Sequence, residues 1–408
     1  MSEDLRPGAD RCTKCSSCDA ACPVAAVDDS FPGPKFQGPE QWRLTQTQDA
    51  DIDPTITKCS NCMRCAGACP TDVPLVEMHT TARAAHLEGV SRLSREYVRA
   101  KMLGNYGRLA GLASRFPRLS NAVMGTGLGR WFAEKTLGIT AEREFPAFAD
   151  ETFREWWDDR GGAAVTNPDK RVAYFHGDYA NYNTPEVGRA MVAVFEHFGY
   201  EVAVPDQRCS GTPMFANGLL EDARRAATHN VETFHALVEE GYDVVCTCTS
   251  CSMALRLEYP ALFEVPGTEE VAAHTWDALE YLRVHEDLEA ALDSTAGPDR
   301  TLTYHAPCHA RVQGLGSQTP ELLEAAESVT VDDAGDSCSG ISGTYGWKSE
   351  HYDTSMAVGE PMFEHMEAGP AREGITECPT CAMQMEHGTG YDVSHTIEVL
   401  AEQLSGVE

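Results

Sequence analysis

The chain has 408 residues, of which 42% are hydrophobic and 8% aromatic, enough for two or three globular domains that each bury a core. Its 63 acidic and 32 basic side chains give a formal net charge of −31, which argues against nucleic-acid binding because phosphate contacts need a basic surface. Only 7 of the basic residues are lysines, and this excess of carboxylates predicts a surface adapted to high salt, as in halophiles.

Nothing in the chain has the pattern of a targeting or membrane segment. The first twelve residues lack the basic and apolar stretches of a signal peptide, and there is no run of about 18 apolar residues. We therefore expect a cytoplasmic protein, in which the 16 cysteines stay reduced. Clustered cysteines in such a compartment indicate metal binding.

Two runs of four cysteines, each followed by proline, stand near the start of the chain. Both have the spacing C-x2-C-x2-C-x3-C-P of bacterial two-cluster ferredoxins, in which the fourth cysteine of each run ligates the other cluster. One predicted [4Fe–4S] cluster is held by Cys12, Cys15, Cys18 and Cys69. The other is held by Cys59, Cys62, Cys65 and Cys22. The alternative, structural zinc, normally uses C-x2-C pairs rather than four-cysteine runs.

The residues that follow the second run predict helices. Leu75 to Ala85 has helical spacing, which indicates a mainly helical ferredoxin domain over residues 1–90. In residues 91–143 the charge inverts, with ten Arg or Lys against three Glu and apolar residues at three- or four-residue intervals. Such basic amphipathic helices either dock on an anionic membrane or a partner, or pack on their own domain. The remainder of the 91–170 segment is predicted to be a linker.

From residue 171 onward, strand and helix patterns alternate. Strands are expected at 171–176, 200–204, 242–246 and 301–304, and helices at 185–198, 219–240 and 396–404. This alternation predicts two α/β domains with mainly parallel strands, over residues 171–298 and 299–408. The predicted fold class is thus α+β multidomain, with a helical two-cluster ferredoxin domain before two tandem α/β domains.

The two α/β domains are related by an internal repeat. An offset of 129 places Cys209-Ser-Gly on Cys338-Ser-Gly, and an offset of 130 places Cys248-Thr-Ser-Cys251 on Cys378-Pro-Thr-Cys381. The same offset places Asp178 on Cys308. Each of these residues falls at a predicted strand-to-helix turn, where α/β sheets collect ligands.

The duplicated Cys…Cys-x-Gly…Cys-x-x-Cys pattern resembles the cysteine-rich (CCG) domains of heterodisulfide reductase subunits. Tandem ferredoxin runs before two such domains also occur in the iron–sulfur subunits of glycolate and lactate oxidases and of anaerobic glycerol-3-phosphate dehydrogenase. The stretches Tyr174-Phe-His-Gly-Asp-Tyr-Ala-Asn-Tyr-Asn183, Ala216-Asn-Gly218 and Gly343-Thr-Tyr-Gly-Trp-Lys348 are most similar to the iron–sulfur subunit of the last of these enzymes.

The sequence departs from the family pattern at three positions. Serine replaces the second cysteine of Cys-Cys-Gly at Ser210 and Ser339, and Asp178 replaces the leading cysteine of the first domain. We therefore expect a four-thiolate [4Fe–4S] cluster rather than the family's non-cubane cluster in the second domain. Its ligands are Cys308, Cys338, Cys378 and Cys381. The first domain offers Cys209, Cys248 and Cys251, with Asp178 or Cys246 as fourth ligand, for zinc, a labile cluster or no metal.

The resemblance implies an electron carrier that does not oxidise the substrate itself. A flavin-containing dehydrogenase subunit would oxidise glycerol 3-phosphate, and electrons would pass through this chain to menaquinone in anaerobic respiration. We expect a further membrane-linked subunit in the complex. We also expect the basic segment to make peripheral contact with the inner face of the cell membrane. Lys348 and Tyr345 are candidates for contact with a quinone or partner. His305 and His309 flank Cys308. Ordinary packing roles also explain these four side chains.

Two alternative functions fit the same residues. One is the iron–sulfur subunit of a glycolate or lactate oxidase or of a heterodisulfide-reductase-type complex. The other is a zinc-binding scaffold that assembles a complex without carrying electrons.

Overall fold

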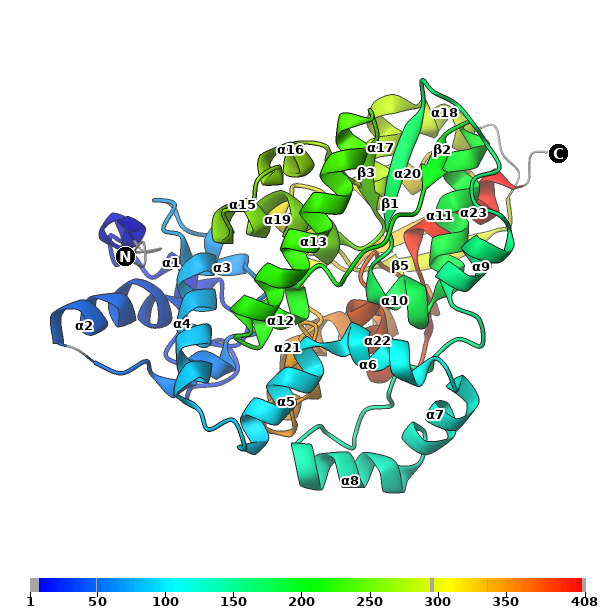
Figure 1. Ribbon diagram of the computed structural model, residues 1–408. Coiled ribbons are helices and arrows are strands. Elements are labelled where there is room, and N and C mark those ends of the chain that lie inside the picture. The colour runs from blue at the N-terminus through cyan, green and yellow to red at the C-terminus, as the bar shows by residue number, and fades with distance from the viewer. Residues whose placement is uncertain (1–6, 49, 294–296, 336, 406–408) are drawn as a thin grey trace.

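The computed structural model describes residues 7–48, 50–293, 297–335 and 337–405. Figure 1 shows a helical N-terminal region beside two α/β halves, with a group of helices projecting below them. The fold class predicted from the sequence is confirmed. Of the first twelve residues considered above, residues 1–6 lie outside the described residues, as do residues 406–408 of the predicted last domain.

Short helices make up the N-terminal region, and α4 is the longest of them. The expected helix at 75–85 is present and continues for four more residues. Its last turn ends at Gly89, before the extended Val90. The elements are η1 (Pro7–Arg11), α1 (Ser17–Ala20), η2 (Phe36–Glu40), α2 (Gln41–Gln48), η3 (Pro54–Lys58), α3 (Arg64–Gly67) and α4 (Leu75–Gly89).

The basic segment folds into four consecutive helices. Serine and threonine N-caps, Ser94 and Thr126, begin two of them, and Pro117 occupies the first turn of a third. They are α5 (Arg95–Gly104), α6 (Tyr106–Ala113), α7 (Pro117–Met124) and α8 (Gly127–Leu137). The chain then returns toward the α/β halves, and α7 and α8 lie apart from both sheets at the bottom of Figure 1.

The first α/β half holds a parallel four-stranded sheet in the order β2-β1-β3-β4. Its strands are β1 (Arg171–Phe175), β2 (Glu201–Ala203), β3 (Asp243–Cys246) and β4 (Thr275–Asp277). Its helices are α10 (Gly177–Tyr182), α11 (Pro185–His197), α12 (Thr212–Ala216), α13 (Leu220–Glu239), α14 (Thr249–Met253), η4 (Ala254–Glu258), α15 (Tyr259–Leu262), α16 (Thr268–Ala273), α17 (Ala278–His285) and α18 (Leu288–Asp293).

The second half repeats this topology, with a parallel sheet in the order β6-β5-β7-β8. Its strands are β5 (Arg300–Tyr304), β6 (Val329–Asp333), β7 (Glu373–Ile375) and β8 (Asp392–Ser394). Its helices are α19 (Cys308–Val312), α20 (Gln318–Leu323), η5 (Tyr345–Trp347), η6 (Ser349–His351), α21 (Tyr352–Ala368), α22 (Pro379–Thr389) and α23 (Thr396–Leu404). Both sheets lie within the predicted ranges 171–298 and 299–408; the domain boundaries themselves stay predictions.

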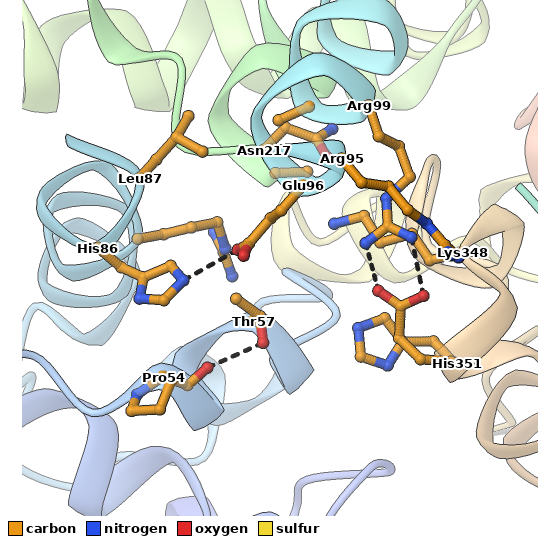
Figure 2. Close-up of a pocket in the computed structure, with 14 residues that line it drawn as sticks. Pro54, Thr57, His86, Leu87, Arg95, Glu96, Arg99, Asn217, Lys348 and His351 are labelled. Carbon is orange, nitrogen blue, oxygen red and sulfur yellow. Dashed lines mark hydrogen bonds and ion pairs between the residues drawn. The ribbon is translucent and has the colours of Figure 1, made fainter. Parts of the chain in front are cut away.

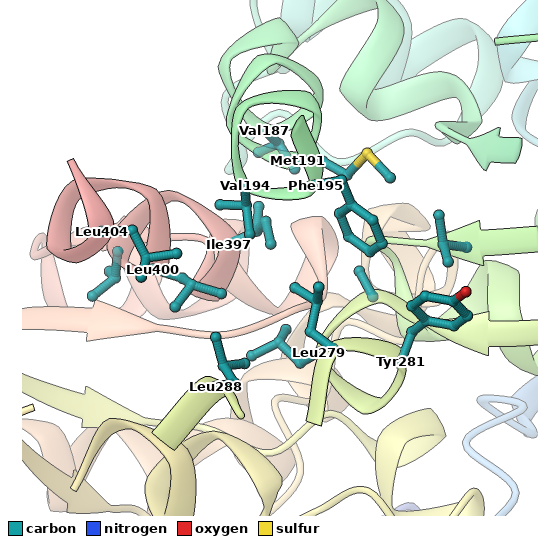
Figure 3. Close-up of a cluster of buried hydrophobic side chains, with 14 of the residues drawn as sticks. Val187, Met191, Val194, Phe195, Leu279, Tyr281, Leu288, Ile397, Leu400 and Leu404 are labelled. Atoms are coloured by element: carbon teal, nitrogen blue, oxygen red, sulfur yellow. The ribbon is translucent and has the colours of Figure 1, made fainter. Parts of the chain in front are cut away.

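One apolar core joins the two halves. Val172 and Tyr174 of the first sheet and Leu302 and Tyr304 of the second belong to the same cluster of buried side chains. Helix α11 packs against α23 at its centre, and Figure 3 shows side chains of both helices meeting those of α17 and α18. Because this core is continuous, the two sheets hold a fixed position relative to each other.

The segment expected to be a linker contains a buried helix, α9 (Phe153–Asp159). Thr152 and Glu155 form a capping box at its start, which fixes the helix in place. Phe153 is fully buried and contacts Tyr174 of β1 with ring centroids 5.4 Å apart. The segment therefore belongs to the shared core, which its Pro and Gly content did not reveal.

We predict that Phe153→Ala lowers the free energy of unfolding by about 3–5 kcal/mol, because it leaves a large cavity in the shared core. Phe116→Ala, at a side chain that is 69% exposed, is the matched control and should change stability by less than about 0.5 kcal/mol. Denaturant unfolding followed by circular dichroism measures both. Equal effects of the two substitutions would contradict the packing described here.

Candidate metal centres

Each N-terminal cysteine run is folded as a tight loop with the same unusual backbone. The residues directly before and after its second cysteine have positive φ: Lys14 and Ser16 in one run, Asn61 and Met63 in the other, with φ between 60° and 64°. Non-glycine residues rarely adopt this conformation. The two loops therefore share one tightly bent backbone shape.

Four thiols from both runs line one cavity. The cavity is walled by Pro34, Val76 and His79 and by the loop from Cys59 to Cys65. The thiols are those of Cys22, Cys59, Cys62 and Cys65, the same four that the crossover spacing predicts. A cavity surrounded by four thiols fits a [4Fe–4S] cluster, whose irons are held by four cysteine thiolates.

The surroundings of this cavity favour bound, deprotonated thiols. Burial raises the pKa of the Cys59 thiol, but contact with His79 and the charge of Arg83 outweigh it and lower the pKa to about 6. Burial and the neighbouring thiols raise the pKa of Cys62 and Cys65. Such desolvated thiols ionise readily only when a metal takes the place of the proton.

The second crossover set lies closer to solvent. Cys15 is exposed, Cys12 and Cys69 are half-buried, and Cys18 is buried. Cys12, Cys18 and Cys69 meet in one small core cluster, and the charges of Cys12 and Cys15 act on the pKa of Cys18 and Cys69 respectively. The backbone N–H of Val73 donates to Cys69 Sγ over 3.4 Å. These four thiols therefore also come together, at the outer edge of the protein.

The predicted ligands of the second α/β half all follow the carboxyl ends of its strands. Cys308 follows β5, Cys338 follows β6, and Cys378 and Cys381 follow β7. Cys308 Sγ lies 3.6 Å from Cys338 Sγ, and a hydrogen bond with Cys381 lowers the pKa of Cys378 to about 6 against the effect of burial. The structure thus gathers the four thiols at one edge of the sheet.

The Cys338-Ser339-Gly340 turn has a tightly fixed backbone. Gly340 has φ +83°, and a Cβ there would lie 2.1 Å from the carbonyl oxygen of Ser355. Only glycine fits this approach. Ser339 Oγ donates a hydrogen bond of 3.3 Å to Cys381 Sγ. The serine therefore faces the thiol site, where the family pattern has a second cysteine.

In the first half, both candidates for the fourth ligand lie near other thiols, Asp178 beside Cys209 and Cys246 near Cys248. Burial raises the pKa of the Asp178 carboxyl to about 6, while contact with the Cys209 thiol lowers it, and its buried Oδ2 has no hydrogen-bond partner in the described residues. The Cys248 and Cys251 thiols contact each other. Cys246 ends β3 inside the apolar core. An orphaned buried carboxylate oxygen beside thiols fits a metal ligand.

A helix of the basic segment covers this first site. A Cβ on Gly107 of α6 would lie 2.4 Å from Asp178 Oδ2, and Tyr106 stacks on Tyr179 with centroids 5.4 Å apart. Spacing alone gave no signal for this contact. Within the described ranges, no three His, Cys, Asp or Glu side chains converge closely enough to ligate a single ion.

The ferredoxin loop and the second α/β site touch. His309 Nε2 lies 3.4 Å from the Asn61 carbonyl oxygen, and the charge of Cys308 acts on the pKa of Cys62. Tyr345, seven residues after Cys338, packs in the core cluster that contains Cys22. The buried thiol set of the ferredoxin region therefore adjoins the second α/β site.

Of the two histidines that flank Cys308, His305 is fully buried and His309 is half-buried. Burial lowers the pKa of His305 to about 3 and that of His309 to about 4. His309 bridges Ser250 Oγ and the Asn61 loop, which is a positioning role. Sequence reasoning missed His79 and Arg83 beside Cys59, although their four-residue spacing places them on one face of the predicted helix.

Comparison with known proteins agrees with this arrangement. Residues 8–73 match the family described as a 4Fe-4S dicluster domain, and residues 172–256 and 302–386 each match the cysteine-rich domain. Lactate utilization protein A of Exiguobacterium sp. is 31% identical over 53% of this chain and 91% of its own length. One of the subunits of fumarate reductase (CoM/CoB) of Methanothermobacter marburgensis is 29% identical over 54% of this chain and 42% of its own length.

One similarity extends over nearly the entire chain. It is to one of the subunits of the anaerobic glycerol-3-phosphate dehydrogenase of Escherichia coli, which is 33% identical over 398 residues, 97% of this chain and 98% of that protein. The match includes both cysteine runs and both cysteine-rich halves. The chain therefore belongs to the family of this anaerobic glycerol-3-phosphate dehydrogenase subunit.

Proposed function

We propose that the chain is the iron–sulfur electron-transfer subunit of a membrane-associated, quinone-linked glycerol-3-phosphate dehydrogenase. A flavin-containing subunit would oxidise glycerol 3-phosphate, and menaquinone would receive the electrons, with a further membrane-linked subunit in the complex. The main support is the contact of the Cys59–Cys65 loop with the Cys308 site, which joins two groups of thiols inside one protein. Clusters bound there would supply one-electron transfer.

The ligand sets that we propose follow the cysteine spacing and the internal repeat, and the proximity of the thiols supports them. Two [4Fe–4S] clusters belong to the ferredoxin region, with the crossed cysteine sets given above. A third is assigned to Cys308, Cys338, Cys378 and Cys381. Zinc or a labile cluster at Cys209, Cys248, Cys251 and Asp178 would require these side chains to draw closer together, because within the described residues they do not converge on a single ion position. The exposed edge near Cys15 is where the electron donor would approach, because the Cys59–Cys65 loop lies between that edge and Cys308.

A single experiment tests the overall assignment. Purification of the complex with its bound subunits should recover a flavin-containing dehydrogenase, and glycerol 3-phosphate should reduce the iron–sulfur signals of this chain. Recovery of a lactate or glycolate oxidase subunit would favour the alternative that the lactate utilization relatives support. Zinc without reducible iron would instead favour an assembly scaffold.

The third ligand set can be tested with Cys338→Ser. We expect this variant to lose about four irons per protein and the matching electron paramagnetic resonance signal, because a four-thiolate cluster loses one ligand. Ser337→Ala, next to the same loop, is the control and should keep both. Unchanged iron content in Cys338→Ser would exclude this cysteine as a ligand.

The fourth ligand of the first site can be distinguished by two variants. Asp178→Asn should reduce the metal content of this site at least tenfold, because it removes a charged oxygen donor. Cys246→Ala should leave the content unchanged, because Cys246 lies in the apolar core. Metal analysis of preparations that also carry Cys338→Ser removes the contribution of the second α/β site, and the two ferredoxin clusters add the same iron content to every preparation. The opposite result would assign Cys246 as the ligand.

Contact with the membrane is proposed for the lobe formed by α6, α7 and α8, residues 106–137. In the described residues, thirteen large hydrophobic side chains are exposed, and eight of these lie in this lobe. They are Leu109, Leu112, Phe116, Leu119, Val123, Leu128, Trp131 and Phe132. The lobe also has five basic residues against one glutamate, which suits an anionic bilayer surface. No described helix has the length and apolarity to span a membrane.

We predict that Val123→Asp weakens binding to vesicles of anionic lipid roughly tenfold, because a side chain that inserts into the interface becomes charged. Val284→Asp is the matched control, since Val284 is 62% exposed and Val123 57%, but Val284 lies on α17 outside the lobe. Vesicle sedimentation measures both. Equal loss in the two variants would refute the lobe as the contact surface.

A further inference from the structure

A second cavity lies at the junction of the ferredoxin region, helix α5 and both α/β halves. Figure 2 shows His86 and Glu96 on one side of it, with Arg95, Arg99 and Lys348 on the other. We call it the junction pocket. Its lining consists of Pro54, Thr57, Arg83, His86, Leu87, Arg95, Glu96, Arg99, Ala100, Ala216, Asn217, Lys348, Glu350 and His351.

The junction pocket carries an excess of positive charge in a strongly acidic protein. Four of the chain's 32 basic side chains line it, against two carboxylates. Arg99 is paired with Glu350, and Glu96 accepts from His86 over 2.9 Å. In the described residues, the remaining three cations, Arg83, Arg95 and Lys348, have no carboxylate within ion-pair distance.

The three unpaired cations are held in different ways. Arg83 is fixed by hydrogen bonds to the carbonyl oxygens of Cys59 and Phe215, at 3.1 and 3.3 Å. Arg95 donates to Ser349 Oγ at 3.4 Å. Across the described part of the chain, the Lys348 ammonium has neither a hydrogen bond nor an ion pair. An ammonium group without a partner at the wall of a pocket needs an anion or water to compensate it.

We infer that the junction pocket binds a phosphate monoester group, with Lys348 and Arg95 as its contacts and Arg83 adding positive potential. The cations come from α4, α5 and the Trp347–Ser349 turn, so they approach a ligand from several directions. A single guanidinium would instead offer its donors in one plane. A tetrahedral dianion has oxygens in several directions and fits this arrangement better than a planar carboxylate. The site is independent of the thiol sites and of the proposed electron transfer.

The electrostatics of Lys348 give this site a measurable signature. Burial, followed by the charges of Arg99 and Arg83, lowers the pKa of Lys348 to about 7, while Glu350 and Glu96 act in the opposite direction. His351 is the other titratable neighbour, and burial and the charge of Lys348 lower its pKa to about 4. A bound dianion raises the pKa of Lys348, so Lys348 takes up to about half a proton on binding at pH 7. Any phosphate that is monoanionic in solution and binds as the dianion releases a proton, so the uptake by Lys348 is measured as the difference between the wild type and a variant without this ammonium.

The phosphate group has two possible sources, which separate experiments distinguish. For a soluble ligand, inorganic phosphate is titrated calorimetrically into the full, cluster-loaded chain in buffers of different ionisation enthalpy. For a lipid headgroup, binding to vesicles with phosphatidic acid, a monoester, is compared with vesicles of phosphatidylglycerol, a diester, at equal surface charge. The lobe at residues 106–137 responds to both lipids, whereas the pocket should respond only to the monoester.

Lys348→Met should weaken phosphate binding at least tenfold and abolish the proton uptake due to Lys348, or remove the preference for phosphatidic acid if the ligand is a lipid. Thr57→Trp, which fills the pocket without removing a charge, should have the same effect. Lys170→Met is the control, because Lys170 is paired with Glu286 away from the pocket. Iron content confirms that each variant folds. No difference between Lys348→Met and Lys170→Met in either experiment would overturn the inference.

Discussion

The packing of α11 against α23 fixes the positions of all four candidate metal centres. It joins the two sheets in one dry core, so that neither half can move without exposing buried apolar surface. The carboxyl ends of both sheets carry the candidate ligands, and the ferredoxin region docks against these ends. Arg83 reaches the Phe215 carbonyl oxygen in the first half, and His309 of the second half reaches Asn61. Electron transfer weakens steeply with distance, so this rigidity has a direct functional value.

The unequal distribution of charged and apolar side chains over the surface also sets one part of the chain, the lobe, apart from the rest. In a chain with net charge −31, the lobe at residues 106–137 holds eight of the thirteen exposed large hydrophobic side chains of the described residues and five basic residues against one glutamate. Helix α6 belongs both to this lobe and to the cover of the first site, where Gly107 meets Asp178. A change in the orientation of the lobe would therefore reach that site directly. The second site instead faces the ferredoxin loop.

Much of the fold could be predicted from local sequence patterns, because those patterns report local physics. The alternation of apolar strands and helices placed β1, β3, β5 and α23 within one or two residues. The crossed cysteine spacing also grouped Cys22 with Cys59, Cys62 and Cys65, which line one cavity. Contacts between distant segments were not predictable in this way. Three examples are the position of Tyr345 beside Cys22, the contact of Gly107 with Asp178 and the junction pocket. They depend on how the ferredoxin region, the basic segment and the two α/β halves pack together, and the periodicity of the sequence carries no information about this packing.

The serines of the two Cys-Ser-Gly turns show how a small substitution can change the character of a site while the fold stays the same. Ser339 Oγ donates to Cys381 Sγ, and in the first half a hydrogen bond with Ser210 partly opposes the rise in the pKa of Cys251 that contact with Cys248 and burial cause. A cysteine at either position would add a thiolate, whereas serine stabilises the negative charge on a thiolate already present. Hydrogen bonds to ligand sulfurs raise the reduction potential of an iron–sulfur cluster. On the proposed ligand set of the second site, Ser339 replaces a fifth thiolate by a hydrogen-bond donor, so a four-thiolate cluster bound there would accept electrons more readily.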